Sequence, residues 1–260
     1  MNILEYEMID VLKKLKNEYG VFQIKAEYEN EGSRQVELMR LKDVADSAGL
    51  PIILKIGGCE AVTDMYEALS LGAKGIIAPM VETAFATSKF IDAVEKFIAE
   101  DNRKDIEFAI NVETITAVNN FDEMLKLKNI HTLDSITFGR VDFTGSIKKD
   151  RSHVETDEVF MYYVDVFKKA KANNLRTALG GAISLGSIEN IRTLIRLNLL
   201  DKYETRKLVY RPEGIETYNA GIQEGIKFEL AWLLSKRRYY HRITIEDEKR
   251  IEMLEKRVNG

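Results

Sequence analysis

FAINVET at 108–114 and SITFGRVDF at 135–143 are two short apolar runs, and a segment with the apolar spacing of a helix joins them. Continuous apolar runs of this length are typical of strands that are buried on both faces of a sheet. Each run ends beside a carboxylate, Glu113 in the first and Asp142 in the second. A polar residue at the C-terminal end of a buried strand has left the core, so we expect both carboxylates to face a mouth of the fold.

Two carboxylates that are delivered to one rim by adjacent parallel strands form a site of hard oxygen ligands. Such a site suits a divalent cation, and we predict that Glu113 and Asp142 bind Mg²⁺. Mn²⁺ accepts the same ligands. The alternative is that each carboxylate only caps the helix after its strand, because acidic side chains are favourable near helix N-termini.

The same alternation extends along most of the chain. Further strand-like runs stand at 21–29, 51–58, 75–80, 176–182 and 207–214, and segments with helical spacing of apolar residues separate them. Strands that alternate with amphipathic helices imply a parallel sheet, which is either a closed barrel or an open doubly wound sheet. We predict a TIM (β/α)8-type barrel, because polar residues close nearly every strand. Seven strands are recognised, so the barrel requires an eighth that is short or hidden near the N-terminus.

The C-terminal part of the chain differs from the rest. We predict that residues 1–215 form the barrel and that residues 216–260 form a C-terminal helical extension. Within the extension, a capping-type pattern from Thr244 to Asp247 predicts the start of a separate short helix that ends at Val258. The extension is too long to be only the last helix of a barrel. We therefore expect it to pack on a neighbouring subunit of a homo-oligomer.

Composition limits the classes of function. The 260 residues suit one barrel domain, since such barrels take about 250 residues. A net charge of −4 gives no basic surface, so we expect neither nucleic acid nor a membrane as a partner. The single Cys59 excludes an internal disulfide and fits a reducing compartment. Without a long apolar run or a signal-peptide pattern, we predict a cytoplasmic protein.

Three segments carry a family resemblance: GAKGIIAPMVETA (72–84), FAINVETITAVNNFDEML (108–125) and ITFGRVDF (136–143). They are similar to segments of the HpcH/HpaI aldolase and citrate lyase β-subunit family, and the resemblance covers about residues 20–215. It implies a TIM barrel of the phosphoenolpyruvate/pyruvate superfamily that cleaves or forms carbon–carbon bonds next to a carbonyl. It also implies that Glu113 and Asp142 bind Mg²⁺ or another divalent ion.

The first two strands depart from the family pattern. The first strand commonly reads D-x-E-H or D-L-E-D in the family; here Glu27 matches the Glu, whereas Lys25 replaces the Asp. Tyr28 stands in place of a histidine that the aldolase branch uses in proton transfer. Lys55 stands in place of an arginine that grips the substrate, which keeps the charge but loses the bidentate fork.

We predict a mouth that holds a mixture of acids and cations: Lys25, Glu27, Lys55, Glu113, Arg140 and Asp142. The predicted catalytic residues are Lys55, Glu27 and Tyr28, and the predicted substrate-binding residues are Lys25, Lys55, Arg140 and Arg211. A metal and a cation together would polarise a carbonyl and stabilise an enolate. Two alternatives stay open: Lys25 and Glu27 only pair across the mouth, or Lys25 or Lys55 forms a Schiff base with the substrate.

These residues and the resemblance together predict a divalent-metal-dependent carbon–carbon lyase or aldolase. It would act on a 2-oxo acid or a related carboxylate through an enolate intermediate. One alternative within the same family is a citryl- or malyl-CoA-type lyase, whose substrate is a CoA thioester. Another is a non-catalytic binding protein that retains the barrel, and the departures at Lys25 and Tyr28 are its main support.

Overall fold

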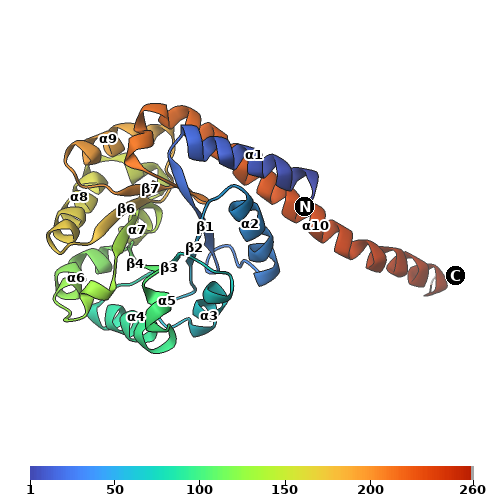
Figure 1. The fold of residues 1–260 in the computed structure, drawn as a ribbon, viewed down its shortest axis with the longest axis horizontal. Helices are drawn as coiled ribbons and strands as arrows, with labels where there is room; N and C mark the ends of the chain where they lie inside the picture. Colours follow the sequence, from blue (N-terminus) through green and yellow to red (C-terminus); the bar gives the residue numbers. More distant parts are fainter. Residues whose placement is uncertain (259–260) are drawn as a thin grey trace.

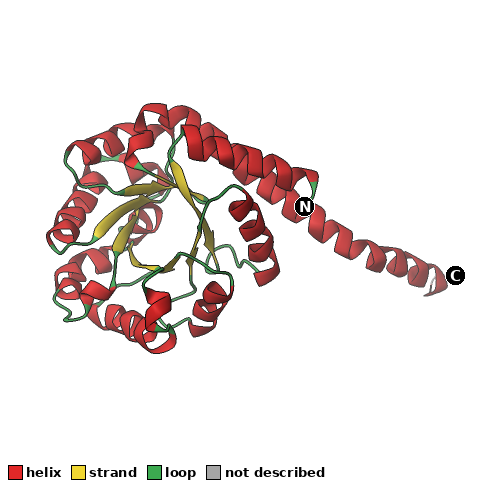
Figure 2. Ribbon diagram, viewed as in Figure 1, coloured by secondary structure: helices red, strands yellow, loops and turns green. Residues whose placement is uncertain are grey.

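The computed structural model describes residues 1–258, apart from the side chain of residue 246, and shows eight strands closed into a barrel inside a ring of helices (Figures 1 and 2). The strands pair in chain order and β8 closes on β1. Their bounds are β1 Val21–Glu27, β2 Ile52–Lys55, β3 Gly75–Ala78, β4 Glu107–Val112, β5 Ser135–Gly139, β6 Arg176–Gly180, β7 Lys202–Glu204 and β8 Leu208–Tyr210. The predicted barrel is confirmed.

Helix α1 precedes β1, and the other helices follow strands β1 to β6 and β8; together they cover the outside of the barrel. They are α1 Ile3–Glu18, α2 Gln35–Ser47, α3 Val62–Ser70, α4 Ala84–Phe97, α5 Glu100–Arg103, α6 Ile115–Leu125, α7 Arg140–Ser146, α8 Asp157–Ala172, α9 Ile188–Arg196 and α10 Tyr218–Val258. Short 3-10 helices lie at η1 Ile130–Thr132, η2 Arg151–Glu155, η3 Leu185–Ser187 and η4 Pro212–Thr217. Thr83 and Thr114 cap α4 and α6, since each side-chain oxygen accepts a hydrogen bond from the backbone N–H three residues on.

The end of the barrel differs from the prediction. Strands β1 to β7 are parallel, but β8 is antiparallel to both β7 and β1. A tight hairpin joins β7 to β8, in which the Thr205 N–H donates to the Leu208 carbonyl over 2.9 Å. The strand that was not recognised is β7, which follows α9; it is short, as one of the two expected alternatives required, and it does not lie near the N-terminus. The predicted last strand at 207–214 is the short antiparallel β8, which ends at Tyr210.

Successive side chains of each strand point alternately outward, where they form a core with the helices, and inward, into the barrel interior. On β1, Ile24 and Ala26 belong to the main core against the helices, whereas Lys25 and Glu27 face the interior. A separate small apolar cluster, Ile53, Ile77, Ala109 and Val209, fills part of the interior. Polar side chains occupy the rest of the interior, so the site begins inside the barrel and opens at the C-terminal ends of β1 to β7.

Helix α10 runs antiparallel to α1 and then continues past the barrel (Figure 1). Its position is fixed by contacts at both ends of α1: Lys14 pairs with Glu224 at 3.4 Å, and the Asn2 amide donates to Ser235 over 3.3 Å. The predicted separate helix that begins near Thr244 is wrong, because α10 is continuous through that residue. Among the described residues, no helix combines the length and the apolar character needed to cross a membrane.

Candidate active site

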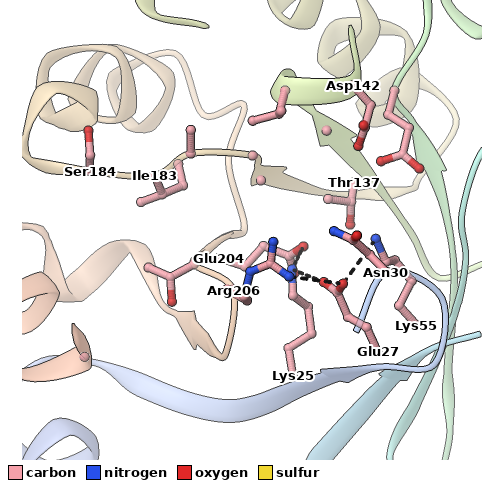
Figure 3. A pocket seen from close by; sticks show the side chains of 18 of the residues that line it. Lys25, Glu27, Asn30, Lys55, Thr137, Asp142, Ile183, Ser184, Glu204 and Arg206 are labelled. Atoms are coloured by element: carbon pink, nitrogen blue, oxygen red, sulfur yellow. Dashed lines mark hydrogen bonds and ion pairs between the residues drawn. The ribbon is translucent and has the colours of Figure 1, made fainter. Parts of the chain in front are cut away.

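A cavity of about 560 Å³ opens at the C-terminal ends of the parallel strands (Figure 3). The interior-facing residues of β1, β2, β4, β5, β6 and β7 form its floor, and the loop after β6 and one face of α10 form a side wall. Five of the predicted site residues line it: Lys25, Glu27, Lys55, Glu113 and Asp142. The structure thus brings together side chains that are more than a hundred residues apart in sequence.

The two predicted metal ligands lie at neighbouring positions of this mouth. Glu113 directly follows β4, and Asp142 lies in the first turn of α7, directly after β5. The Met80 N–H donates to one Glu113 oxygen over 2.9 Å, and the Asn111 amide donates to the other over 3.1 Å. A Cβ atom at Gly139 would overlap the Glu113 carboxylate, so glycine at the end of β5 is what leaves room for Glu113.

Both carboxylates lie where negative charge is unfavourable. Burial raises the pKa of Glu113 to about 7, and the charge of Asp142 adds to this, although the Met80 N–H, Lys55 and Asn111 oppose it. Burial also raises the pKa of Asp142; Lys55 opposes the shift. Two nearby acids whose negative charge is disfavoured in this way would be stabilised by a bound cation.

The donor set fits a magnesium-type ion. The structure supplies two carboxylates, and among residues 1–258 no group of three or more His, Cys, Asp or Glu side chains is arranged to hold a metal. Mg²⁺ commonly uses one or two carboxylates and keeps several positions for water and substrate. Glu113 and Asp142 therefore suit a cation that shares its coordination with a substrate.

Glu27 lies between the two lysines of the mouth. Lys25 Nζ is 3.8 Å from one Glu27 oxygen, and Lys55 Nζ is 3.6 Å from the other. Lys55 also pairs with Glu29 at 2.7 Å. Burial lowers the pKa of Lys55, but the carboxylates of Glu27, Glu29 and Glu113 outweigh burial and the net pKa is raised. A Lys55 ammonium that stays protonated is a good partner for an anion and a poor Schiff-base nucleophile.

Arg140 does not reach the cavity, contrary to the prediction. Its side chain is fully buried, and its guanidinium donates to the carbonyls of Gly180 and Gly181 and pairs with Glu155 at 2.9 Å. The physical reason is that α7 begins at Arg140, which turns the chain away from the barrel axis one residue after β5 ends. Arg140 is a structural link between α7, η2 and the loop after β6.

Tyr28 and Arg211 also lie outside the cavity. Tyr28 follows Glu27, so the strand alternation directs it outward, and its hydroxyl donates to Gln35 of α2 over 2.9 Å. Arg211 follows the antiparallel β8 and therefore lies at the opposite end of the barrel, 4.9 Å from the ring centre of Phe22. The prediction that Tyr28 is a catalytic residue and the prediction that Arg211 binds substrate are both contradicted by these positions.

Two residues of the β7–β8 hairpin were missed by the sequence analysis. Glu204 is buried at the end of β7 and pairs with Lys25 at 2.8 Å. Arg206 lies in the hairpin, 4.0 Å from Glu27 and 3.6 Å from Glu31 (Figure 3). Both stand in the charged run KYETRK, which lacks the apolar residues that identify a buried strand.

Known structures share this fold at low sequence identity. An HpcH/HpaI aldolase from Desulfitobacterium hafniense is 17% identical with a TM-score of 0.61, and the match covers 85% of this chain and 89% of that one. An HpcH/HpaI aldolase/citrate lyase family protein from Burkholderia cenocepacia is 11% identical with a TM-score of 0.56, covering 90% and 98%. Macrophomate synthase is 14% identical with a TM-score of 0.55, covering 91% and 82%.

Sequence comparison supplies the evidence for the family. No curated protein matches the chain. The sequence profile of HpcH/HpaI aldolase/citrate lyase matches residues 49–182, which is just over half of the chain and includes both acids of the carboxylate pair. The chain therefore belongs to the HpcH/HpaI aldolase/citrate lyase family of carbon–carbon lyases.

Proposed function

We propose that this protein is a divalent-metal-dependent carbon–carbon lyase that acts on a 2-oxo acid or a related carboxylate through an enolate. The observation that carries the proposal is the carboxylate pair, buried Glu113 and more exposed Asp142, beside the Lys55 ammonium in one cavity. A 2-oxo acid presents a carbonyl and a carboxylate side by side. A metal ion on the carboxylate pair and the neighbouring Lys55 ammonium would place one cation beside each of these two groups.

Glu113 and Asp142 would hold Mg²⁺ or Mn²⁺, which when bound polarises the substrate carbonyl and stabilises negative charge on its oxygen. Lys55 would donate to the substrate carboxylate, and its ion pairs with Glu27 and Glu29 fix the ammonium at the mouth. Glu27 orders the site through its contacts with both lysines. Lys25 lies two residues before Glu27 on β1 and would add positive charge near a bound anion.

Calorimetric titration tests the metal and substrate parts together. EDTA-treated protein is titrated with Mg²⁺ and with Mn²⁺, in the presence and absence of pyruvate or oxaloacetate, beside Glu113→Gln and Asp142→Asn. We expect binding to weaken at least tenfold in both variants, because each removes one of only two charged ligands. We also expect the oxo acid to tighten metal binding. Absence of metal binding by the wild type under all of these conditions would contradict the proposal.

The substrate class is tested by turnover. Pyruvate release is measured from a panel of 4-hydroxy-2-oxo acids, and cleavage of citryl-CoA and malyl-CoA is measured in parallel. Turnover of the free acids supports the proposal, whereas turnover of the thioesters alone would place the protein with the CoA-dependent lyases. A protein that binds metal and oxo acid but turns over nothing would be a binding protein built on the barrel.

A further inference from the structure

The floor of the cavity contains buried oxygen atoms for which the described residues provide no hydrogen-bond partner. They are Oε2 of Glu27, Oδ1 of Asn111, Oγ1 of Thr137 and Oε2 of Glu204. Buried polar atoms in proteins are nearly always hydrogen-bonded, so unpartnered ones need an explanation. Four such atoms from β1, β4, β5 and β7 of one cavity indicate a ligand that donates hydrogen bonds, such as a hydroxyl group or a water molecule.

Glu204 differs from the other three residues because it is a carboxylate of which only one oxygen has a hydrogen-bond partner. Lys25 Nζ donates to its Oε1 over 2.8 Å, while its Oε2 is buried and unpartnered. Gly180 on the neighbouring strand makes room for it, since a Cβ atom there would lie 3.1 Å from Oε1. Among the described residues, Glu27 is shared by three cations, whereas Glu204 pairs with Lys25 alone. Its free oxygen is therefore an oriented proton acceptor.

We propose that Glu204 moves the proton in the carbon–carbon lyase reaction, which Tyr28, in place of the family histidine, is not positioned to do; this rests on the proposed function. In the cleavage direction, Oε2 accepts the proton of the substrate hydroxyl. The electron pair of that O–H bond forms the new C=O bond, and the pair of the broken C–C bond stays on the oxo acid as an enolate. Glu204 then returns the proton to the enolate carbon, which yields the methyl group of the product.

Two half-reactions separate proton transfer from binding. Exchange of pyruvate methyl hydrogens in D₂O requires a base to remove a proton. Decarboxylation of oxaloacetate forms the same enolate by loss of CO₂, with no proton to remove. With Mg²⁺ present, we expect Glu204→Gln to slow methyl exchange by about 100-fold or more and to change decarboxylation by less than tenfold. Glutamine keeps the shape of the side chain and an oxygen for Lys25.

Glu107→Gln is the matched control. Glu107 pairs with the buried Lys202 at 2.7 Å, so this change also breaks a buried lysine–glutamate pair, but at the opposite end of the barrel interior. We expect it to lower stability and to leave both half-reactions unchanged. Normal exchange by folded Glu204→Gln would overturn the assignment, as would equal loss of exchange and decarboxylation, which would indicate a binding role. A wild type that catalyses neither reaction would overturn the proposed function itself.

Discussion

Glu113 lies in surroundings that disfavour its charge, and this affects the stability of the protein. Burial raises its pKa from 4.5 to about 7. Between these two pH values the folded state binds more protons than the unfolded state, so the free energy of unfolding of the metal-free protein falls as the pH rises. The penalty, at most about 3 kcal/mol, is complete above the folded-state pKa and is absent below the unfolded-state pKa.

We therefore expect Glu113→Gln to stabilise the metal-free protein at pH 8 and to have little effect at pH 5. Glutamine keeps an oxygen for the Met80 N–H, and its amide can donate to the unpartnered Oδ1 of Asn111 after that side chain flips. Thermal unfolding in EDTA at the two pH values measures the difference. A gain of about 1–3 kcal/mol at pH 8 is the expected result. A change of the same size at both pH values would contradict the charge-based explanation.

Lys55 is the cation that the geometry places beside the carboxylate pair. We expect Lys55→Met to lower kcat/KM for release of pyruvate by about 100-fold or more, since it removes a charged donor from a poorly hydrated site. Lys55→Arg keeps the charge and should lose less. Lys74→Met, which changes an exposed lysine outside the cavity, is the control. Retention of kcat/KM within a factor of about three in Lys55→Met would exclude Lys55 from substrate binding.

At the scale of the elements, sequence predicted β1 to β6, six of the seven parallel strands, because each contains a short apolar run. The C-terminal ends of such strands converge, so the position of Glu113 near Asp142 followed from the pattern. The antiparallel direction of β8 could not be predicted, because the three residues of β7, KYE, do not resemble a buried strand. Without β7, nothing in the sequence indicates that a hairpin rather than a helical crossover leads into β8. Without β7, the sequence assigned Arg211 to the wrong end of the barrel.

Arg140 shows how an element boundary decides a role. It was predicted to bind substrate, but its guanidinium instead joins η2 to the loop after β6. We expect Arg140→Met to destabilise the fold by about 3–5 kcal/mol, because it removes the cation that pairs with Glu155 and the donor that two carbonyls share. At a temperature where the variant stays folded, KM should change little. Denaturant unfolding and steady-state kinetics test the two parts, and a raised KM with unchanged stability would restore the original assignment.

At the scale of the whole molecule, α10 is the part that the barrel alone does not explain. Its first half packs on α1, whereas residues 241–258 extend away from the barrel (Figure 1). Ile243, Ile251, Leu254 and Val258 are all exposed there. A helix of this length with no packing partner is only marginally stable in water, because helices in proteins depend on burial of an apolar face. The predicted contact with a neighbouring subunit would supply that burial.

We expect the wild type to be a homo-oligomer in which the far end of α10 is buried between subunits. The double variant Ile251→Glu, Leu254→Glu places charges on the apolar face of that segment and should shift the protein towards monomers. Light scattering after size-exclusion chromatography measures the mass, and circular dichroism should show a loss of helix only in the variant. The double variant Glu252→Gln, Glu255→Gln is the control, since it changes exposed positions of the same turns while leaving the apolar residues in place. A monomeric wild type would contradict this, and so would an oligomer that both double variants leave intact.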